Sequence, residues 1–225
     1  MGKYVSVAID GPAGAGKSTM AKRVAKELGY LYVDTGAIYR TVGYHMWLMG
    51  IGPRDADGIR RCLDDVNIEI QHLEDSVQHM ILNGKDVTGE IRTPEMSKYA
   101  SGVSAQKCVR DFLLDMQRAF ARKHNVVMDG RDIGTVVLPK AQVKIFLTAS
   151  PEERAKRRFE ELTETGEKAS YEKVLQDMKQ RDKQDSERAI APLKPAPDAV
   201  KLDTSGNTIE QSVSEILAII RRKLG

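Results

Sequence analysis

The sequence predicts an α/β fold with a central parallel sheet, on three observations. Short apolar runs rich in β-branched residues alternate with longer segments of helical periodicity along most of the chain. The first of these runs leads directly into a glycine-rich loop and then into a helical pattern. Between residues 67 and 88 the pattern changes to paired strand-like segments, which predict a small antiparallel insertion. Alternating strands and helices are typical of three-layer folds whose parallel sheet is covered on both faces.

The composition narrows the class of protein. The 225 residues suffice for one well-buried domain, and 41% apolar with 30% charged residues is typical of a globular protein. A net charge of +3 is too small for a nucleic-acid groove. The two cysteines lack C-x-x-C spacing, and the four histidines lack metal-ligand spacing. With no signal peptide and no apolar stretch of membrane-spanning length, we expect a cytoplasmic protein without nucleic-acid or membrane partners.

Four elements are predicted in the N-terminal part of the chain. Residues 4–9 form a strand, and a helix over 18–28 follows, because apolar residues recur there at helical spacing and Gly29 is a typical helix end. A short strand over 30–33 then leads into a helical stretch that reaches about residue 49.

The next segment departs from this alternation. A helix is predicted over 54–63, and strands are predicted over 67–72 and 77–82. The dipeptide Asn83-Gly84 after the second strand is a strong hairpin signal. We therefore predict a small antiparallel sheet inserted into the main fold, followed by a helix over 103–121.

The second half of the chain returns to alternation. Compact apolar runs at 126–128 and 143–147 are typical of strands that are covered on both faces. A helix over 151–162, a polar loop over 163–170 and a charged helix from 171 to about 189 form a predicted lid. The remaining elements are a strand and a helix, over 200–202 and 209–224.

The strongest functional motif lies between the first strand and the first helix. It matches G-x-x-x-x-G-K-[ST], the phosphate-binding loop, in the strand–loop–helix setting that the motif requires. Its glycines let the backbone curl so that several N–H groups face one anion, and the positive end of the helix adds to the attraction. The lysine supplies a charge for the terminal phosphates, and the serine hydroxyl is a Mg²⁺ ligand. The motif consists of Gly11, Pro12, Ala13, Gly14, Ala15, Gly16, Lys17, Ser18 and Thr19.

A flexible surface turn is the alternative interpretation of these glycines. The strand before the loop and the helix after it favour the phosphate-binding interpretation. We therefore expect a nucleoside triphosphate site.

A carboxylate follows the predicted strand at 126–128. Asp129 would lie at the carboxyl edge of the sheet, where ligands of open α/β sheets bind, and so near Mg²⁺ and the phosphates, directly or through water. The alternative is a hairpin, because Asp129-Gly130 is also a turn signal. Residues 133–139 do not continue as a matching second strand, which favours the site.

Arginines gather in the predicted lid. One set precedes the polar loop, and a second set follows it at spacing i, i+4, i+7, which places its members on one helix face. A charged helix is usually a solvated face, and a lone arginine such as Arg40 has the same alternative. Phosphoryl transfer, however, spreads negative charge that lid arginines neutralise while they exclude water. The two sets are Arg154, Arg157 and Arg158, and Arg181, Asp185 and Arg188.

In combination these motifs resemble the bacterial cytidylate kinase family, whose members are P-loop nucleoside monophosphate kinases. The resemblance covers essentially the whole chain in order and includes the inserted strands. Besides the phosphate loop it is carried by residues 34–40 (DTGAIYR), 89–92 (GEIR), 129–137 (DGRDIGTVV), 143–147 (VKIFL), 181–182 (RD) and 189–193 (AIAPL).

The resemblance implies that loop 11–19 binds ATP, with Arg154 and Arg158 as further ATP ligands. It also implies that Ser101, Arg110 and Asp132 read the cytosine ring. This assignment fits the chemistry, because the exocyclic amine of cytosine donates to a carboxylate, whereas uracil presents an acceptor at that position.

The resemblance further implies ligands for the rest of the acceptor. Thr35, where the family often has serine, lies near its ribose or phosphate, and Asp185 contacts the sugar. The transferring phosphates are surrounded by Arg40, Arg131, Arg181 and Arg188. The implied catalytic set is Lys17, Arg131, Arg181 and Arg188, with Ser18 and Asp129 at the metal.

We therefore expect a monomeric enzyme that transfers the γ-phosphoryl group of Mg-ATP to CMP or dCMP without a covalent intermediate. The expected single domain has a core (1–35, 103–150 and 190–225), a monophosphate-binding insertion (36–102) and a lid (151–189). The nearest alternative is another P-loop kinase, for UMP, AMP or shikimate. A GTPase-type switch is disfavoured because the chain has no N-K-x-D motif, and a nucleic-acid-binding role lacks the charge density.

Overall fold

The computed structural model describes residues 3–72, 77–164, 166 and 169–225. These residues form two compact units. The first unit comprises the chain up to Tyr32 together with Lys123–Gly225, and the second unit comprises Val33–Arg122. Residues 103–122 thus group with the inserted strands rather than with the expected core.

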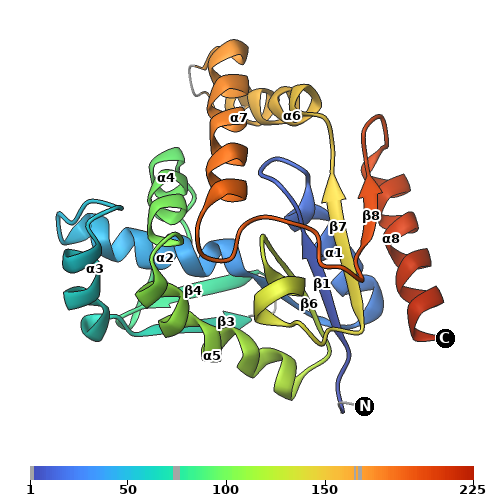
Figure 1. Ribbon diagram of the computed structural model, residues 1–225, viewed down its shortest axis with the longest axis horizontal. Helices are drawn as coiled ribbons and strands as arrows, with labels where there is room; N and C mark the ends of the chain where they lie inside the picture. Colours follow the sequence, from blue (N-terminus) through green and yellow to red (C-terminus); the bar gives the residue numbers. More distant parts are fainter. Residues whose placement is uncertain (1–2, 73–76, 165, 167–168) are drawn as a thin grey trace. The chain divides into compact units, whose positions relative to one another are not determined.

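A five-stranded sheet organises the first unit, in the order β2-β6-β1-β7-β8 (Figure 1). Strand β1 pairs in parallel with β6 on one side and β7 on the other, and β7 pairs in parallel with β8. All residues of β1 and β6 are buried, as the continuous apolar runs predict. The strands are β1 (Ser6–Asp10), β2 (Leu31–Asp34), β6 (Val126–Gly130), β7 (Val143–Thr148) and β8 (Val200–Asp203).

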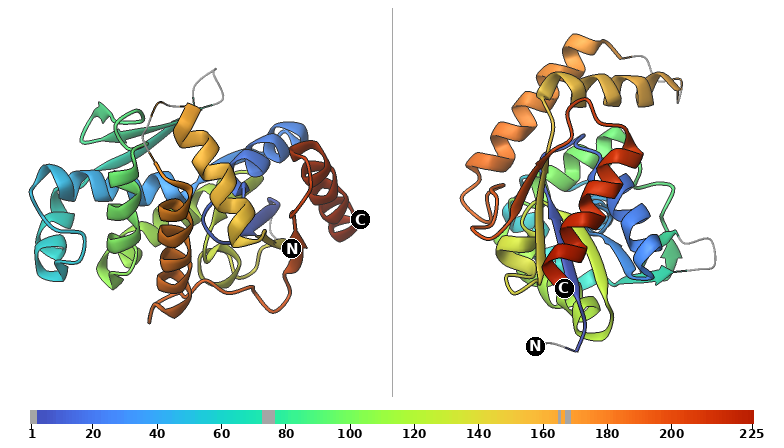
Figure 2. Two further views of the ribbon diagram at one scale, coloured as in Figure 1. Left: turned by 90° about the horizontal axis from the view of Figure 1, so that it is seen from above. Right: turned by 90° about the vertical axis from the view of Figure 1, so that its right-hand side faces the viewer.

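Two helices pack on one face of this sheet and against each other, α1 (Lys17–Leu28) and α8 (Ile209–Leu224) (Figure 2). Their apolar stripes share one core with the sheet, in which Ile9, Val24 and Ile216 are fully buried. The prediction of an α/β fold with a central parallel sheet is confirmed. None of the helices in the described part of the chain is long and apolar enough to cross a membrane.

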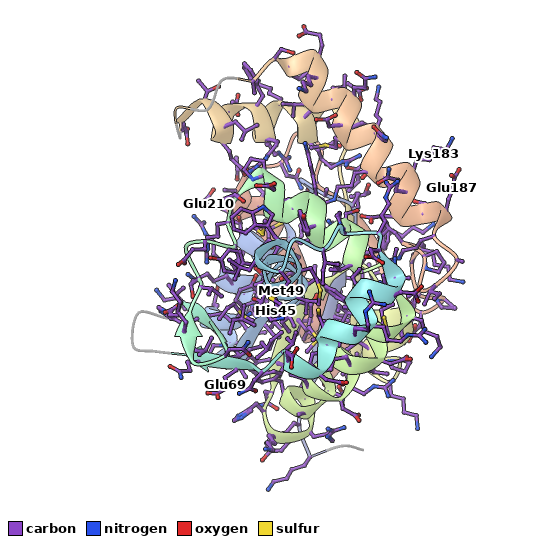
Figure 3. The ribbon with its side chains drawn as sticks, turned by 90° about the vertical axis from the view of Figure 1, so that its left-hand side faces the viewer. His45, Met49, Glu69, Lys183, Glu187 and Glu210 are labelled. Carbon is purple, nitrogen blue, oxygen red and sulfur yellow. The ribbon has the colours of Figure 1, made fainter. Side chains whose placement is uncertain are left out.

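The predicted lid consists of two packed helices, α6 (Pro151–Glu164) and α7 (Tyr171–Glu187). The rings of Phe159 and Tyr171 meet edge to face at 6.3 Å. On α7, Lys183 and Glu187 lie one turn apart on the exposed side (Figure 3). The predicted loop over 163–170 begins later than expected, because α6 continues to Glu164, and residues 165, 167 and 168 lie outside the described residues.

The second unit contains the predicted antiparallel sheet, with strand order β3-β4-β5. Its hairpin turns at Asn83 and Gly84, which adopt φ angles of 49° and 81°. The strands are β3 (Ile68–His72), β4 (Gln78–Leu82) and β5 (Lys85–Asp86). The helices are α2 (Thr35–Leu48), α3 (Ala56–Cys62) with a 3₁₀ turn at Leu63–Asp65, α4 (Pro94–Val103) and α5 (Lys107–Lys123).

Helix α4 is absent from the sequence prediction, which placed a single helix over 103–121. The structure instead ends one helix at Val103 and begins the next at Lys107. The signals for α4 were present in the sequence. Thr93 caps its first turn by accepting from the Met96 N–H at 3.1 Å, and Pro94 occupies its first position.

Candidate active site

The predicted phosphate loop forms a backbone curl between β1 and α1. Gly11, Gly14 and Gly16 adopt φ angles of 153°, 71° and 76°, which only glycine adopts readily. At Gly11 a side chain would also overlap the carbonyl oxygen of Leu147 at the end of β7. The loop is thus held against the sheet with its curl at the positive end of α1.

Lys17 is buried beneath this curl. It is 5% exposed, and its Nζ donates to the carbonyl oxygen of Pro12 at 2.7 Å. Burial and, to a smaller extent, the neighbouring cations Arg131 and Arg181 lower the pKa of Lys17 to about 7, against the opposing effect of Asp129. The site therefore holds a cationic cluster that a bound polyanion would stabilise.

Asp129 lies beside the loop at the carboxyl end of β6, where it is buried. Its Oδ2 accepts from the Ser18 hydroxyl at 2.9 Å, and its Oδ1 accepts from the Tyr32 hydroxyl at 2.9 Å. Strand β6 leads into a π-helical turn rather than a second strand, so Asp129-Gly130 does not form a hairpin. Tyr32 was outside the predicted site, because only the strand order of the structure places β2 beside β6.

The Ser18–Asp129 pair fits a magnesium ion that is shared with a nucleotide. Mg²⁺ prefers oxygen ligands, and next to phosphates it usually binds only one or two protein groups and keeps several waters. The hydroxyl and one oxygen of the carboxylate lie 2.9 Å apart. Over the ranges that the structure describes, no group of three or more His, Cys, Asp or Glu side chains forms a separate metal site.

Asp10, the last residue of β1, is a buried carboxylate that the sequence analysis missed. It accepts from the N–H groups of Ile133 and Gly134 at 2.8 and 2.7 Å. Burial raises the pKa of Asp10 to about 6, although these two hydrogen bonds act to lower it. The signal was available, because Asp10 ends a buried strand just as Asp129 does.

Four of the predicted acceptor residues meet in two ion pairs of the first unit. Arg131 Nε donates to Asp185 Oδ2 at 3.1 Å, and Arg188 Nη2 donates to Asp132 Oδ1 at 3.2 Å. In the second pair both side chains are below 10% exposed. These pairs join the turn after β6 to the end of α7. Arg181, one helix turn before Asp185, lies close enough to Lys17 to lower its pKa.

The guanidinium of Arg154 joins the lid to the phosphate loop. Its Nη1 donates to the Ala13 carbonyl at 2.9 Å, its Nη2 to Asp182 at 2.7 Å and its Nε to the Ala149 carbonyl at 2.9 Å. The side chain is 4% exposed. These three contacts make Arg154 a structural link within the first unit, and its role as an ATP ligand stays a prediction.

The neighbouring residues Arg157 and Arg158 of α6 make different contacts, because the helix directs them differently. Arg158 pairs with Glu161 on its own helix at 2.9 Å, and its side chain is 38% exposed. Arg157 instead reaches the phosphate loop, where its Nη1 lies 3.9 Å from the position of a Cβ added to Gly16. Arg157 was outside the predicted ligand set, because sequence spacing does not fix which of two adjacent residues faces inward.

In the second unit, Asp34 and Arg40 form a local pair at the start of α2. Asp34 caps the helix by accepting from the Ala37 N–H at 2.9 Å, and its other oxygen accepts from Arg40 Nη2 at 3.0 Å. Arg40 Nε is buried and has no hydrogen-bond partner within the described residues. Thr35, the first residue of α2, is buried.

Arg110 of α5 is also buried in the second unit. Its Nε donates to the Ser104 carbonyl at 2.6 Å, and its guanidinium lies over the Tyr39 ring at 5.6 Å. Ser101 is part of the same turn, because its carbonyl accepts from the Ser104 hydroxyl at 3.0 Å. Tyr39 is thus a further residue that holds a predicted base-reading side chain in place.

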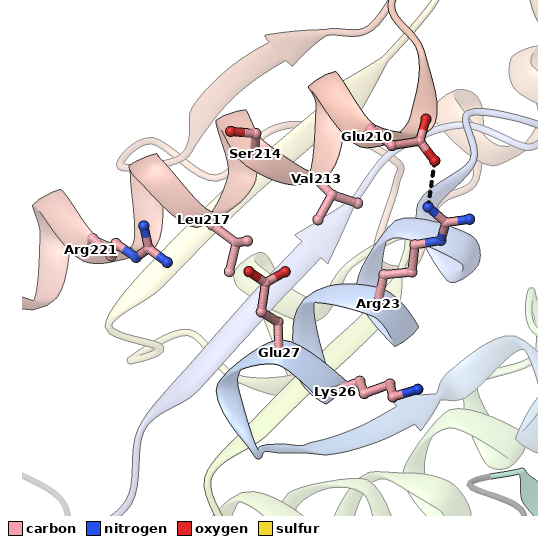
Figure 4. A pocket seen from close by; sticks show the side chains of 8 residues that line it. All are labelled: Arg23, Lys26, Glu27, Glu210, Val213, Ser214, Leu217 and Arg221. Carbon is pink, nitrogen blue, oxygen red and sulfur yellow. Dashed lines mark hydrogen bonds and ion pairs between the residues drawn. The ribbon is translucent and has the colours of Figure 1, made fainter.

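A separate hollow lies between α1 and α8 (Figure 4). The Arg23–Glu210 ion pair at 2.8 Å borders it, and Val213 and Leu217 form its apolar part. Its lining includes none of the predicted site residues.

Comparison with known proteins gives one consistent family. A family model described as cytidylate kinase matches residues 7–222. A cytidylate kinase of Caldicellulosiruptor saccharolyticus is 47% identical over 223 residues, which cover 99% of this chain and 98% of the relative. A cytidylate kinase of Carboxydothermus hydrogenoformans is 50% identical over 217 residues, which cover 96% of this chain and 97% of the relative.

Among solved structures, an uncharacterized protein from Eubacterium ventriosum shares the fold with a TM-score of 0.52. It is 13% identical, and the match covers 96% of this chain and 98% of that protein. At this identity the likeness concerns the fold alone.

The contacts of Arg154 and Arg158 predict a large loss of stability on truncation of the first and almost none on truncation of the second. Arg154→Ala should lower the free energy of unfolding by about 3 kcal/mol, because it leaves Asp182 and two carbonyls without their buried donor. Arg158→Ala, on the same helix, should change it by less than about 0.5 kcal/mol, because its ion pair is exposed. Equilibrium urea denaturation measures both values. Equal losses in the two variants would contradict the structural role of Arg154.

Proposed function

Because this chain belongs to the cytidylate kinase family, whose members transfer a phosphoryl group from ATP, we propose that it converts CMP or dCMP to the diphosphate. The reaction moves the γ-phosphoryl group of ATP to the acceptor phosphate and leaves ADP. The observation that carries the proposal is the buried Lys17 under the glycine curl, with Arg131 and Arg181 beside it.

The phosphate loop binds the donor nucleotide in this proposal. Backbone N–H groups of the curl and the positive end of α1 hold the phosphates, and Lys17 neutralises their terminal charge. Ser18 and Asp129 would hold the Mg²⁺ that accompanies ATP. When bound, the ion would neutralise negative charge on the phosphate oxygens.

Asp132 distinguishes cytosine from uracil. Its carboxylate accepts a hydrogen bond from the exocyclic amine of cytosine, whereas the carbonyl at the same position of uracil would repel it. The ion pair with Arg188 orients this carboxylate. A buried site that is built to bond an amine rejects the analogue that lacks it, because polar groups are then left unpaired.

The transfer itself is a direct displacement. An oxygen of the acceptor phosphate bonds to the γ-phosphorus as the bond to the β–γ bridging oxygen breaks, and ADP leaves. The acceptor phosphate is already anionic at neutral pH, because its second pKa is about 6, so no general base is required. Arg131, Arg181 and Arg188 neutralise the charge on the transferring group.

Residues of the second unit are the remaining proposed ligands of the acceptor. Arg40 suits a phosphate oxygen, because its buried Nε donor has no hydrogen-bond partner among the described residues. Thr35 supplies a hydroxyl near the ribose or phosphate, and Ser101 and Arg110 contact the base. The monomeric state and the cytoplasmic location stay predictions.

Removing the Lys17 charge should abolish turnover without unfolding the protein. Lys17→Met keeps most of the side-chain volume, and we expect kcat to fall by about a thousandfold, because a preorganised charge on the transferring group is lost. Melting temperature should not fall, since the variant removes a buried cation. Lys22→Met, at an exposed position on α1, is the matched control. Near-normal kcat in a folded Lys17→Met protein would contradict this role.

Truncation of Asp132 should reduce the selectivity for CMP over UMP. We expect Asp132→Ala to reduce the ratio of kcat/KM for CMP over UMP by about 10- to 100-fold, the value of one hydrogen bond to a charged group. Asp177→Ala, at an exposed position on α7, serves as the control. A ratio that Asp132→Ala leaves unchanged would remove Asp132 from the base site.

A further inference from the structure

The turn that follows Asp132 is capped from outside its own segment. The π-helical turn η2 (Ile133–Val137) begins directly after Asp132, which stands at its N-cap position. Aspartate at this position ordinarily accepts from the first N–H groups of its own turn. Here the Asp132 side chain makes no such bond. Asp10 of β1 accepts from the Ile133 and Gly134 N–H groups instead, at 2.8 and 2.7 Å.

The sheet brings Asp10 to this turn. Strands β1 and β6 pair in parallel with Asp10 opposite Gly130, so the carboxylate emerges beside the residues that follow β6. Gly134 permits the close approach. A Cβ at Gly134 would lie 3.3 Å from Asp10 Oδ2 and 3.2 Å from Lys144 Cδ, tighter than ordinary van der Waals contact. Both oxygens of Asp10 are thus engaged by the turn.

Because Asp10 caps the turn, the Asp132 carboxylate is directed elsewhere. It meets Arg188 Nη2 at 3.2 Å, and its side chain is 5% exposed. Without Asp10 the two N–H groups would be buried and lack an acceptor, which is costly. Asp132 stands at the N-cap position, from which an aspartate ordinarily accepts from such N–H groups.

We propose that Asp10 is a positioning residue for recognition of the acceptor base, because it caps the η2 turn in place of Asp132 and so keeps the Asp132 carboxylate directed toward the base and Arg188. This proposal rests on the proposed function of Asp132. Loss of Asp10 turns the Asp132 carboxylate onto its own backbone, and the enzyme then loses selectivity although Asp132 is still present.

A double-mutant cycle tests this coupling. The readout is the ratio of kcat/KM for CMP over UMP in the wild type, Asp10→Ala, Asp132→Ala and the double variant. We expect each single variant to lose selectivity by about 10-fold or more, and the double variant to lose no more than Asp132→Ala alone. An unchanged ratio in Asp10→Ala, or losses that multiply in the double variant, would overturn the proposal.

Two further variants separate positioning from general stability. Asp10→Asn keeps the side-chain volume and one acceptor, so it should fold even if Asp10→Ala does not, and its selectivity should lie between those of the wild type and Asp132→Ala. Ile216→Ala removes a buried side chain of α8, so it should lower the melting temperature but leave the ratio unchanged. A loss of selectivity in Ile216→Ala equal to that in Asp10→Asn would show that destabilisation alone explains the effect.

A structural readout distinguishes failure of this proposal from failure of the proposed function. If the wild type phosphorylates neither CMP nor UMP, the proposed function fails. A crystal structure of Asp10→Ala then tests the capping role of Asp10 independently of activity. If Asp10→Ala does not fold, Asp10→Asn takes its place. The feature to observe is the position of the Asp132 side chain. A carboxylate turned onto the Gly134 or Thr135 N–H supports the proposal, and one still at Arg188 overturns it.

Discussion

The phosphate loop of the first unit is organised around one cation that is buried under a curl of glycines. Lys17 is nearly inaccessible, and its Nζ donates to the backbone carbonyl of Pro12 at 2.7 Å. Burying an ammonium group is unfavourable unless anions or acceptors compensate it. The compensation by protein groups is incomplete, so burial lowers the pKa of Lys17 from its ordinary value of 10.5 to about 7. A bound triphosphate supplies the missing negative charge.

The carboxylates at the sheet edge complete this electrostatic arrangement. Asp10 and Asp129 end adjacent parallel strands, and both act to raise the pKa of Lys17. Each also has a structural task, because Asp10 caps the η2 turn and Asp129 accepts from Ser18 and Tyr32. The same groups therefore offset part of the cost of burying Lys17 and fix the side chains that a nucleotide would meet.

Local pattern predicted the central sheet and the phosphate loop, because each rests on short-range spacing. The predicted common helix face of Arg181, Asp185 and Arg188 holds only for the first two, because α7 ends at Glu187 and Arg188 is extended. It did not reveal the role of Asp10, whose partners lie more than a hundred residues away. Nor did it choose between Arg157 and Arg158, since one residue of helix register turns a side chain by about 100° around the helix axis. Side-chain hydrogen bonds across the sheet become visible only when the strand order is known.

Proton uptake on nucleotide binding tests this account most directly. Titration calorimetry at pH 8 with a nonhydrolysable ATP analogue and Mg²⁺, in buffers of different ionisation enthalpy, gives the number of protons bound. Lys17 is largely neutral at that pH without nucleotide and charged beside phosphates, because the bound anion raises its pKa. We expect uptake of close to one proton in the wild type and none in a variant that lacks the lysine. Equal uptake in both proteins, or none in the wild type, would contradict the account.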